Sequence, residues 1–410
     1  MKFNMKVAND NGNSEHDILI NETLIQAPNV YAKTRNIPML EERDMNKFIN
    51  QIEDNLIVSV DSQAIGKLPI NCFIGNYATG SGEYLRSIDV TYNDKLNADL
   101  VIINTLGQIA GQSVKQAFND NKSLDERIEV NVSMVTALPV NQYSKKNGKT
   151  FSAKFTDHKH TVKVFTPNGS VEVVITFDYV KTLAESILTT FFLQNYNKNV
   201  KRIEEWLGYD LPKNLKLYSK ENNKYDLKEV NDDYFNNKKI QFVDIGEGTT
   251  ELPQTNGLIF DENFIKGINC GIGHATEKVL KDFIEDANLT KYSRQDFSNV
   301  LKDRQHDLHR LAKDHIEIPL EEQSLEITKA TIHEIAKANN EVDITVVHGG
   351  GSILMKEHLE NELIKHFSKD NVYIDLLYVP ENIAVVVNVI GSMLFLESDI
   401  FKSLKSKAIG

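Results

Sequence analysis

Hydrophobic residues alternate with polar ones in some stretches of the chain and recur at helical spacing in others. Short apolar runs that predict strands occur at 3–9, 128–135, 161–165, 171–177, 240–243 and 344–347. Apolar residues spaced three and four apart predict amphipathic helices at 97–118 and 180–196, from 267–274 to about 285, and at 353–367. This alternation of strands and helices predicts an α/β fold.

Two polar stretches interrupt the pattern. Residues 198–239 are charged and rich in asparagine, and Trp206 and Leu207 are isolated apolar residues that could hold the segment to the protein. We therefore expect an inserted surface helix and loop there. Residues 286–322 are strongly polar, and they predict a smaller subdomain.

Two turns that begin with an acidic residue follow predicted strands. The first is Asp10-Asn11-Gly12-Asn13-Ser14 and the second is Asp244-Ile245-Gly246-Glu247-Gly248-Thr249-Thr250. Glycines and hydroxyls suit a tight turn whose backbone N–H groups face a phosphate tail, with Asp10 and Asp244 beside a hydrated Mg²⁺. One such turn could also begin a plain hairpin, but the second copy favours a nucleotide held between two similar halves.

Two further glycine elements are candidate nucleoside contacts. Gly349-Gly350-Gly351-Ser352 lies between a predicted strand and a predicted helix, where the backbone can approach a bulky group closely. Gly271 and Gly273 open another helix, which would bring Glu277 and Lys278 near the ribose or base. The glycines of that helix could equally serve close helix packing.

These elements, in this order, resemble the actin/Hsp70/sugar-kinase superfamily, and within it the ParM-like plasmid-partition actins. Residues 128–139, 383–392 with Gly391, and Phe73-Ile74-Gly75-Asn76 also match that layout. The resemblance implies two actin-like domains, which are duplicated ribonuclease-H-like folds, with a nucleotide cleft between them. The implied first domain is 1–172 plus 380–410 with a smaller subdomain at about 33–97, and the second is 173–379 with one at about 286–323.

The same resemblance implies a carboxylate that positions the attacking water. It follows the strand before the interdomain helix, which makes Asp178 the first candidate and Glu185 the second. A helix N-cap role for Asp178 stays open.

One position departs from the family pattern. Members often carry a phosphate-binding lysine on the strand after the first turn, but the equivalent residue here is Asp17. Phosphate neutralisation must then depend on Mg²⁺ and backbone amides, or on another lysine such as Lys6.

Composition limits the partners. The 46 basic and 58 acidic residues give a net charge of −12, which argues against direct DNA binding as the main role. Cys72 and Cys270 lack metal-ligand spacing, so we expect a reducing cytoplasm. No apolar run is long enough to cross a bilayer, and no membrane partner is expected.

The resemblance implies a filament-forming ATPase that binds Mg-ATP or Mg-GTP, hydrolyses it to destabilise its polymer, and segregates plasmid DNA. Its expected partners are further copies of itself, head to tail, and a DNA-bound adaptor of the ParR type. A sugar- or acetate-kinase-like phosphotransferase and a nucleotide-binding scaffold with negligible hydrolysis stay open. An Hsp70-like chaperone is disfavoured because about fifteen residues follow Leu394.

Overall fold

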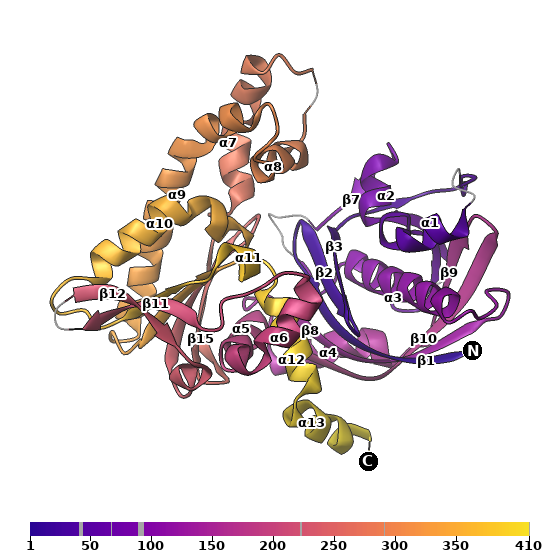
Figure 1. The fold of residues 1–410 in the computed structure, drawn as a ribbon, viewed down its shortest axis with the longest axis horizontal. Helices are drawn as coiled ribbons and strands as arrows, with labels where there is room; N and C mark the ends of the chain where they lie inside the picture. The colour runs from indigo at the N-terminus through magenta and orange to yellow at the C-terminus, as the bar shows by residue number, and fades with distance from the viewer. Residues whose placement is uncertain (41–43, 67, 89–93, 222–223, 291, 410) are drawn as a thin grey trace. The chain divides into compact units, whose positions relative to one another are not determined.

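The structure is a computed structural model, and it describes residues 1–40, 44–66, 68–88, 94–221, 224–290 and 292–409 (Figure 1). The chain forms two compact units. The first comprises 1–195, 199–211 and 388–410, and the second comprises 196–198 and 212–387. Each unit has its own sheet and its own hydrophobic core.

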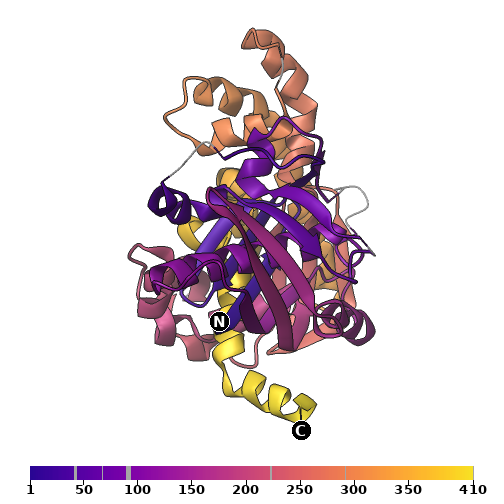
Figure 2. The ribbon, with the colours of Figure 1, turned by 90° about the vertical axis from the view of Figure 1, so that its right-hand side faces the viewer.

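The first unit is built on a ten-stranded sheet. Across the sheet the strands are β3 (Thr23–Pro28), β2 (Glu15–Ile20), β1 (Lys2–Asn11), β8 (Ile128–Leu138), β10 (Gly169–Ala184), β9 (His160–Thr166), β5 (Ile57–Asp61), β6 (Ile70–Ile74), β4 (Tyr31–Lys33) and β7 (Leu85–Arg86). Strands β1, β8 and β10 run parallel, and β1, β2 and β3 form an antiparallel meander. Figure 2 shows the same ribbon turned by 90° about the vertical axis.

Helices cover this sheet. They are α1 (Met45–Asn50), α2 (Gly75–Gly80), α3 (Asp99–Asn119), α4 (Lys145–Thr156), α5 (Glu185–Leu193), most of α6 (Tyr196–Leu207), most of α12 (Val387–Glu397) and α13 (Asp399–Ile409), with a 3-10 turn at Ile52–Asp54. The predicted helix at 97–118 corresponds to α3, which is buried along most of its length because its apolar residues face the core.

The second unit is built on a seven-stranded sheet. Its strands, in order across the sheet, are β12 (Lys224–Val230), β11 (Leu215–Glu221), β17 (Asp375–Tyr378), β16 (Ile344–His348), β13 (Lys239–Ile245), β14 (Thr250–Asn256) and β15 (Ile259–Ile268). Its helices are α7 (Ile272–Asp286), α8 (Arg294–Lys302), α9 (His309–Lys337), α10 (Gly350–Phe367) and α11 (Glu381–Ala384), with a 3-10 turn at Asp232–Phe235.

The two sheets share one topology. In the first unit, the meander β1-β2-β3 is followed in chain order by β8 and β10, which add in parallel on the other side of β1. In the second unit, β13-β14-β15 is followed by β16 and β17 in the same arrangement. The chain is therefore an internal duplication, and the turn after β1 corresponds to the turn after β13.

The structure differs from the sequence prediction around residue 180. A helix was expected from 180 to 196, but β10 continues to Ala184 and only then gives way to α5. The strand is favoured because Val180 and Thr182 face the interior while Tyr179 and Lys181 are partly exposed, which is an alternation of period two. The first unit includes residues 1–195 and 388–410, whereas domain boundaries at 172 and 380 were expected.

The stretch 198–239 also differs from the expected helix and loop. After α6 it forms the antiparallel hairpin β11–β12, and β11 joins the sheet beside β17. Leu215, Leu217 and Val230 are buried there, so the hairpin adds to the core of the second unit.

Candidate functional site

The first acidic turn is held in a fixed shape by its neighbours. Asp10 lies opposite Asp17 in the β1–β2 pair, and Asn11 lies opposite His16. A Cβ at Gly12 would lie 2.8 Å from the carbonyl oxygen of Glu15, so a side chain here would force the turn to move.

A layer of buried amides supports the turn from behind. Asn29 Nδ2 donates to the Gly12 carbonyl at 2.6 Å, and Asn104 Nδ2 from α3 donates to Asn29 Oδ1 at 2.8 Å. The backbone N–H of Asn29 also donates to the Ser14 carbonyl, while Asn13 is partly exposed at the tip. Helix α3 thereby positions the turn.

A second buried group surrounds Asn9. Its Oδ1 accepts from Thr105 Oγ1 at 3.1 Å and from Asn11 Nδ2 at 3.1 Å. His16 Nε2 lies 2.8 Å from the same oxygen. Burial and the nearby Lys95 charge lower the pKa of His16 to about 3, so its ring is neutral and Nε2–H is the donor.

A buried lysine, Lys95, lies beside this turn. Its side chain is 2% exposed, and its Nζ lies 2.9 Å from Glu185 Oε1 and 3.5 Å from Asp10 Oδ1. Glu185 is the first residue of α5, and Asp10 is the next-to-last residue of β1, so one buried ammonium joins two carboxylates from different elements. Asn388 also donates a side-chain hydrogen bond to Asp10 and accepts one from Thr189 at 2.8 Å.

Burial controls the ionisation of this cluster. It raises the pKa of Asp10, although the charge of Lys95 opposes that shift. Burial alone would lower the pKa of Lys95, but Glu185 and Asp10 outweigh it and the pKa is raised. Lys95 therefore stays protonated, and it is a positive charge held beside the first acidic turn.

Asp178, the first candidate for positioning water, has different partners. It lies within β10, where Lys405 Nζ from α13 donates to its Oδ2 at 2.6 Å. Ser133 Oγ donates to its Oδ1 at 2.8 Å, and Asn131 Nδ2 to its Oδ2 at 3.1 Å. The side chain fixes the C-terminal helix to the sheet, and it does not cap a helix.

The strand register separates Asp178 from the turn. Asn9 lies opposite Thr136, and Thr136 lies opposite Thr182. Asp178 is four residues before Thr182, which is about 13 Å along an extended strand. Of the two predicted carboxylates, the structure brings only Glu185 to Asp10.

Lys6, which was one possible phosphate-binding lysine, has another partner. Lys6 is paired with Glu397 at 2.8 Å and its side chain is 54% exposed. Asp17 accepts from Gln26 Nε2 at 2.9 Å. The lysine at the turn is Lys95, which no spacing rule on the β2 strand could find.

In the second unit, the second acidic turn ends β13. Asp244 lies opposite His348 in the parallel β13–β16 pair, with its Oδ1 3.6 Å from His348 Nδ1. Burial lowers the pKa of His348 to about 3, so this ring is neutral. The turn closes with the Gly246 N–H donating to the Thr249 carbonyl at 2.9 Å, and Thr250 Oγ1 donates to the Cys270 carbonyl at 2.7 Å.

The start of α7 packs directly on this turn. The N–H of Gly273 donates to the Glu247 carbonyl at 2.8 Å, and that of Ile272 to the Gly246 carbonyl at 3.3 Å. A Cβ at Gly271 would lie 2.3 Å from the Glu247 oxygen and 2.6 Å from the Gly248 carbonyl carbon. These glycines therefore allow the start of α7 to pack closely on the turn, which is one of the two roles that the sequence left open for them.

The third glycine element meets the same turn. Gly349 has a φ of +89°, and a Cβ there would lie 2.6 Å from both Asp244 Oδ1 and the Ile245 carbonyl. Gly350 has open space around its Cβ position, whereas a Cβ at Gly351 would lie 2.3 Å from Ile245 Cγ2. Ser352 Oγ donates to the Gly349 carbonyl at 2.7 Å.

Two predicted contacts of α7 are engaged elsewhere. Glu277 Oε1 lies 2.9 Å from Arg294 Nη1, and Lys278 Nζ lies 3.2 Å from Glu322 Oε2. Arg294 in turn borders Gly273, with its Nη1 3.2 Å from the position of a Cβ there. Arg294 thus connects Glu277 to the region of the turn, whereas Lys278 pairs with a residue of α9.

One carboxylate lies beside each acidic turn, and the two belong to different units. Within the described part of the chain, no group of three or more His, Cys, Asp or Glu side chains could hold a metal ion. Mg²⁺ needs only one or two carboxylates because it keeps waters and takes phosphate oxygens. Asp10 and Asp244 are each the next-to-last residue of a strand that leads into a glycine turn of their own unit.

Comparison with solved structures identifies the fold. No protein-family model and no curated sequence matches the chain. The crystal structure of the actin-like protein Alp7A matches with a TM-score of 0.67 at 15% identity, covering 99% of each chain. The archaeal actin homolog Ta0583 matches with 0.61 at 13% identity over 95% of this chain and 98% of that one. Bacillus thuringiensis ParM with ATP matches with 0.57 at 14% identity over 98% and 99%.

The chain has an actin-like fold. The predicted α/β class and the two-domain actin-like architecture are confirmed, and the internal duplication of sheet topology agrees with both. Among the described residues of this actin-like chain, no helix has the length and apolarity needed to span a membrane.

Proposed function

We propose that this chain is a nucleotide-dependent, filament-forming actin-like ATPase. The observation that carries the proposal is Lys95, a buried ammonium joined to Asp10 and Glu185 beside the first acidic turn. Burying such a cluster is costly, and clusters of this kind are typical of functional sites. The actin-like fold supports a nucleotide as the ligand, and so does the similar solved structure of Bacillus thuringiensis ParM with ATP.

The turns after β1 and β13 are proposed to hold the phosphates of one ATP or GTP. Asn11, Gly12, Asn13 and Ser14 would contribute from the first turn, and Gly246 to Thr250 from the second. Mg²⁺, when bound, would neutralise phosphate charge, with Asp10 and Asp244 as its protein carboxylates. The elements at Gly271 and at Gly349 to Ser352 would border the nucleoside.

The cluster residues have separate proposed tasks. Glu185 orients the attacking water and accepts its proton, which a carboxylate at a helix start beside the turn can do. Lys95, already protonated, exchanges its contact with Asp10 for a phosphate oxygen. Glu185 is preferred to Asp178 because the strand register separates Asp178 from the turn.

Hydrolysis is proposed to control assembly. Loss of the terminal phosphate removes contacts that hold the two turns together, and a change of this kind can weaken a polymer. Plasmid segregation through a ParR-type, DNA-bound adaptor is the cellular role we propose, since the acidic chain is unsuited to binding DNA itself.

Pelleting and light scattering on the pure protein test the assembly proposal. We expect a pellet with Mg-ATP or Mg-GTP, less with the diphosphate, and none without nucleotide or after chelation of magnesium. Monomer in every condition would contradict it, and phosphate transfer to a small acceptor would favour a phosphotransferase.

Phosphate release tests the catalytic assignment. Glu185→Gln keeps the size of the side chain but removes the base, and the rate should fall at least about 100-fold. Asp178→Asn is the matched control, and it should release phosphate at nearly the wild-type rate. Equal rates in wild type and Glu185→Gln would remove Glu185 from the mechanism.

A further inference from the structure

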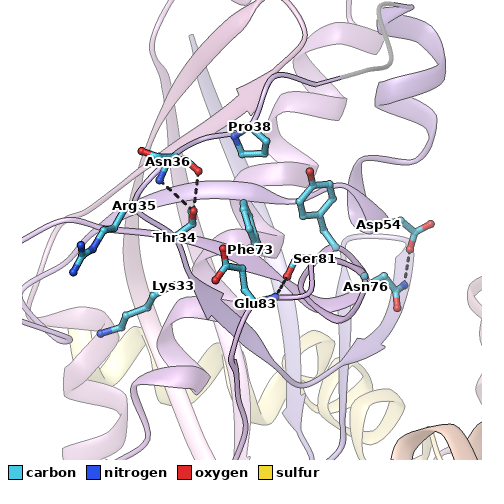
Figure 3. Close-up of a pocket in the computed structure, with 12 residues that line it drawn as sticks. Lys33, Thr34, Arg35, Asn36, Pro38, Asp54, Phe73, Asn76, Ser81 and Glu83 are labelled. Carbon is cyan, nitrogen blue, oxygen red and sulfur yellow. Dashed lines mark hydrogen bonds between the residues drawn. The ribbon is translucent and has the colours of Figure 1, made fainter. Parts of the chain in front are cut away.

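The first unit contains a pocket whose lining residues fall between Lys33 and Glu83 in the chain, so this lining is distinct from both acidic turns (Figure 3). Its volume of about 830 Å³ is within the range of small-molecule sites. Across the pocket lie two basic side chains, a carboxylate, an aromatic wall and a carboxylate–amide pair. This arrangement indicates a ligand that is anionic at one end and carries a flat ring.

The basic end consists of Lys33 and Arg35, which Figure 3 shows on one side of Phe73. Neither cation forms an ion pair with a residue that the structure describes. The segment between them is held in shape, because Thr34 Oγ1 donates to the Asn36 carbonyl at 2.7 Å and accepts from the Asn36 N–H at 3.3 Å. Two unpaired cations close together on an acidic chain match a phosphate group, which accepts several charge-assisted hydrogen bonds.

The middle of the pocket has an aromatic wall. Phe73 and Tyr77 meet edge to face, with ring centroids 5.1 Å apart and planes inclined by 65°. Phe73 is 5% exposed, whereas Tyr77 is partly exposed, so the tyrosine ring offers a surface on which a flat ligand can stack. Aromatic side chains are the usual stacking platform for nucleic-acid bases.

The far end of the pocket presents hydrogen-bond acceptors. Asp54 Oδ1 accepts from Asn76 Nδ2 at 2.7 Å, which leaves Asp54 Oδ2 and Asn76 Oδ1 without donors among the described residues. The neighbouring Glu53 fixes this end to α3, since it accepts from Gln112 Nε2 at 2.6 Å and from Lys115 Nζ at 2.7 Å. Guanine has two adjacent donors, N1–H and N2–H, on its Watson–Crick edge, and one carboxylate can accept both.

Glu83 limits the charge of the ligand. Figure 3 shows it between the Lys33–Arg35 end and the Asp54 end. A carboxylate in that place can accept hydrogen bonds from ribose hydroxyls, as acidic residues do in dinucleotide sites. It also offsets part of the positive charge of the basic end, which disfavours a long phosphate tail and favours a single phosphate.

We propose that this pocket binds a guanine nucleoside monophosphate. The phosphate contacts Lys33 and Arg35, and the ribose faces Glu83. The base stacks on Tyr77 and donates through N1–H and N2–H to Asp54. The order phosphate, ribose and base is the order in which the matching groups lie across the pocket. The site uses neither acidic turn, so it is independent of the proposed ATPase function.

Calorimetric titration of the full chain with guanosine monophosphate (GMP) tests the site. EDTA is present throughout, because nucleotide binding at the acidic turns is proposed to need magnesium. We expect one GMP per chain and an affinity at least about tenfold higher than for adenosine monophosphate (AMP), whose edge lacks the two adjacent donors. Guanosine, which lacks the phosphate, should also bind at least about tenfold more weakly than GMP.

Variants with matched controls locate the bound GMP. Arg35→Gln should weaken GMP about tenfold, because it removes a charged partner of the phosphate, and should leave the affinity for guanosine unchanged. Asp54→Asn should reduce the preference for GMP over AMP about tenfold. Arg86→Gln and Asp61→Asn are the controls, since both residues are exposed in the same region but do not line the pocket, and they should match wild type.

Asp10→Asn separates this pocket from the proposed ATP or GTP site, and it should leave GMP affinity unchanged. GMP binding that depends on Asp10 but not on Arg35 would place GMP at the first acidic turn, which overturns the pocket and leaves the proposed function standing. Intact GMP binding in a chain that neither binds nor hydrolyses Mg-ATP or Mg-GTP supports the pocket and contradicts the proposed function. Absence of GMP binding in wild type, or equal affinity for GMP and AMP, also overturns the pocket.

Discussion

At the scale of single residues, Lys95 explains why two carboxylates can be buried together. Asp10 is 8% exposed, and an isolated charge at that depth would be unstable without a partner. The ammonium between Asp10 and Glu185 supplies that partner, and it leaves a protonated group where a phosphate would lie in the proposed function. The cluster therefore links the stability of the first unit to its proposed chemistry.

Lys95→Met tests that link. Removing the ammonium leaves two buried carboxylates unpaired, which should cost the first unit about 3–5 kcal/mol and weaken nucleotide binding. Lys6→Met is the control, because Lys6 forms an exposed ion pair with Glu397 worth about 1 kcal/mol or less. Thermal melting and a nucleotide titration measure both effects, and equal melting temperatures for the two variants would contradict the role of Lys95.

His16 makes the first unit sensitive to acid. Its pKa is lowered from its usual 6.5 to about 3 in the folded protein, so the unfolded chain binds an extra proton between those values. Stability due to this residue is complete above pH 6.5 and declines as the pH falls, by about 2 kcal/mol at pH 5. His16→Gln should therefore lose less thermal stability than wild type between pH 7.5 and pH 5, and an unchanged loss would refute the assignment.

The sequence predicted the acidic turns but could not identify all of their partners. Asp10 and Asp244 were found because an acid, glycines and hydroxyls follow an apolar strand, which is a local pattern. Lys95 is 85 residues from Asp10 and precedes a helix with no motif, so only tertiary structure brings it there. Asp178 was preferred to Glu185 because the end of β10 was placed too early.

At the scale of elements, glycines allow strand ends and turns to meet. Gly349 at the end of β16 lies against Asp244 and Ile245 of the neighbouring parallel strand β13. Gly271 at the start of α7 lies against Glu247 and Gly248 in the same way. The second acidic turn is thus enclosed by two other elements of its own unit.

Gly349→Ala should disturb this arrangement. A methyl group would lie 2.6 Å from Asp244 Oδ1 and would also strain a backbone with a φ of +89°, at a cost of about 1–3 kcal/mol. Nucleotide affinity should fall together with thermal stability. Gly350→Ala is the matched control, because nothing lies within 4 Å of its Cβ position, and it should resemble wild type. Equal behaviour of the two variants would contradict the packing described.

Element prediction succeeded where one periodicity dominated. Helix α3 was predicted because its apolar residues follow a regular helical spacing, and β1 and β8 because they are short apolar runs. The end of β10 and the β11–β12 hairpin were missed, although Val180 and Thr182, and likewise Leu215 and Leu217, alternate with polar residues. The end of β10 was assigned to the helix that follows it, and the charged, asparagine-rich surroundings of β11 and β12 indicated a surface helix and loop.

At the scale of the whole molecule, the duplicated topology gives the chain two equivalent acidic turns. Each follows the first strand of a meander, beside a parallel strand, in a unit with its own core. The proposed function requires both turns to act on one nucleotide. Neither turn alone would then provide full affinity.

Calorimetric titration with Mg-ATP, or Mg-GTP if that is preferred, tests this central claim most directly. We predict one nucleotide per chain, with affinity reduced at least about tenfold by Asp10→Asn and likewise by Asp244→Asn, since each removes a charged contact. Asp178→Asn should bind as wild type does, and melting curves will verify that each variant is folded. Wild-type affinity in either folded Asp10→Asn or folded Asp244→Asn would contradict the claim that both turns hold one nucleotide.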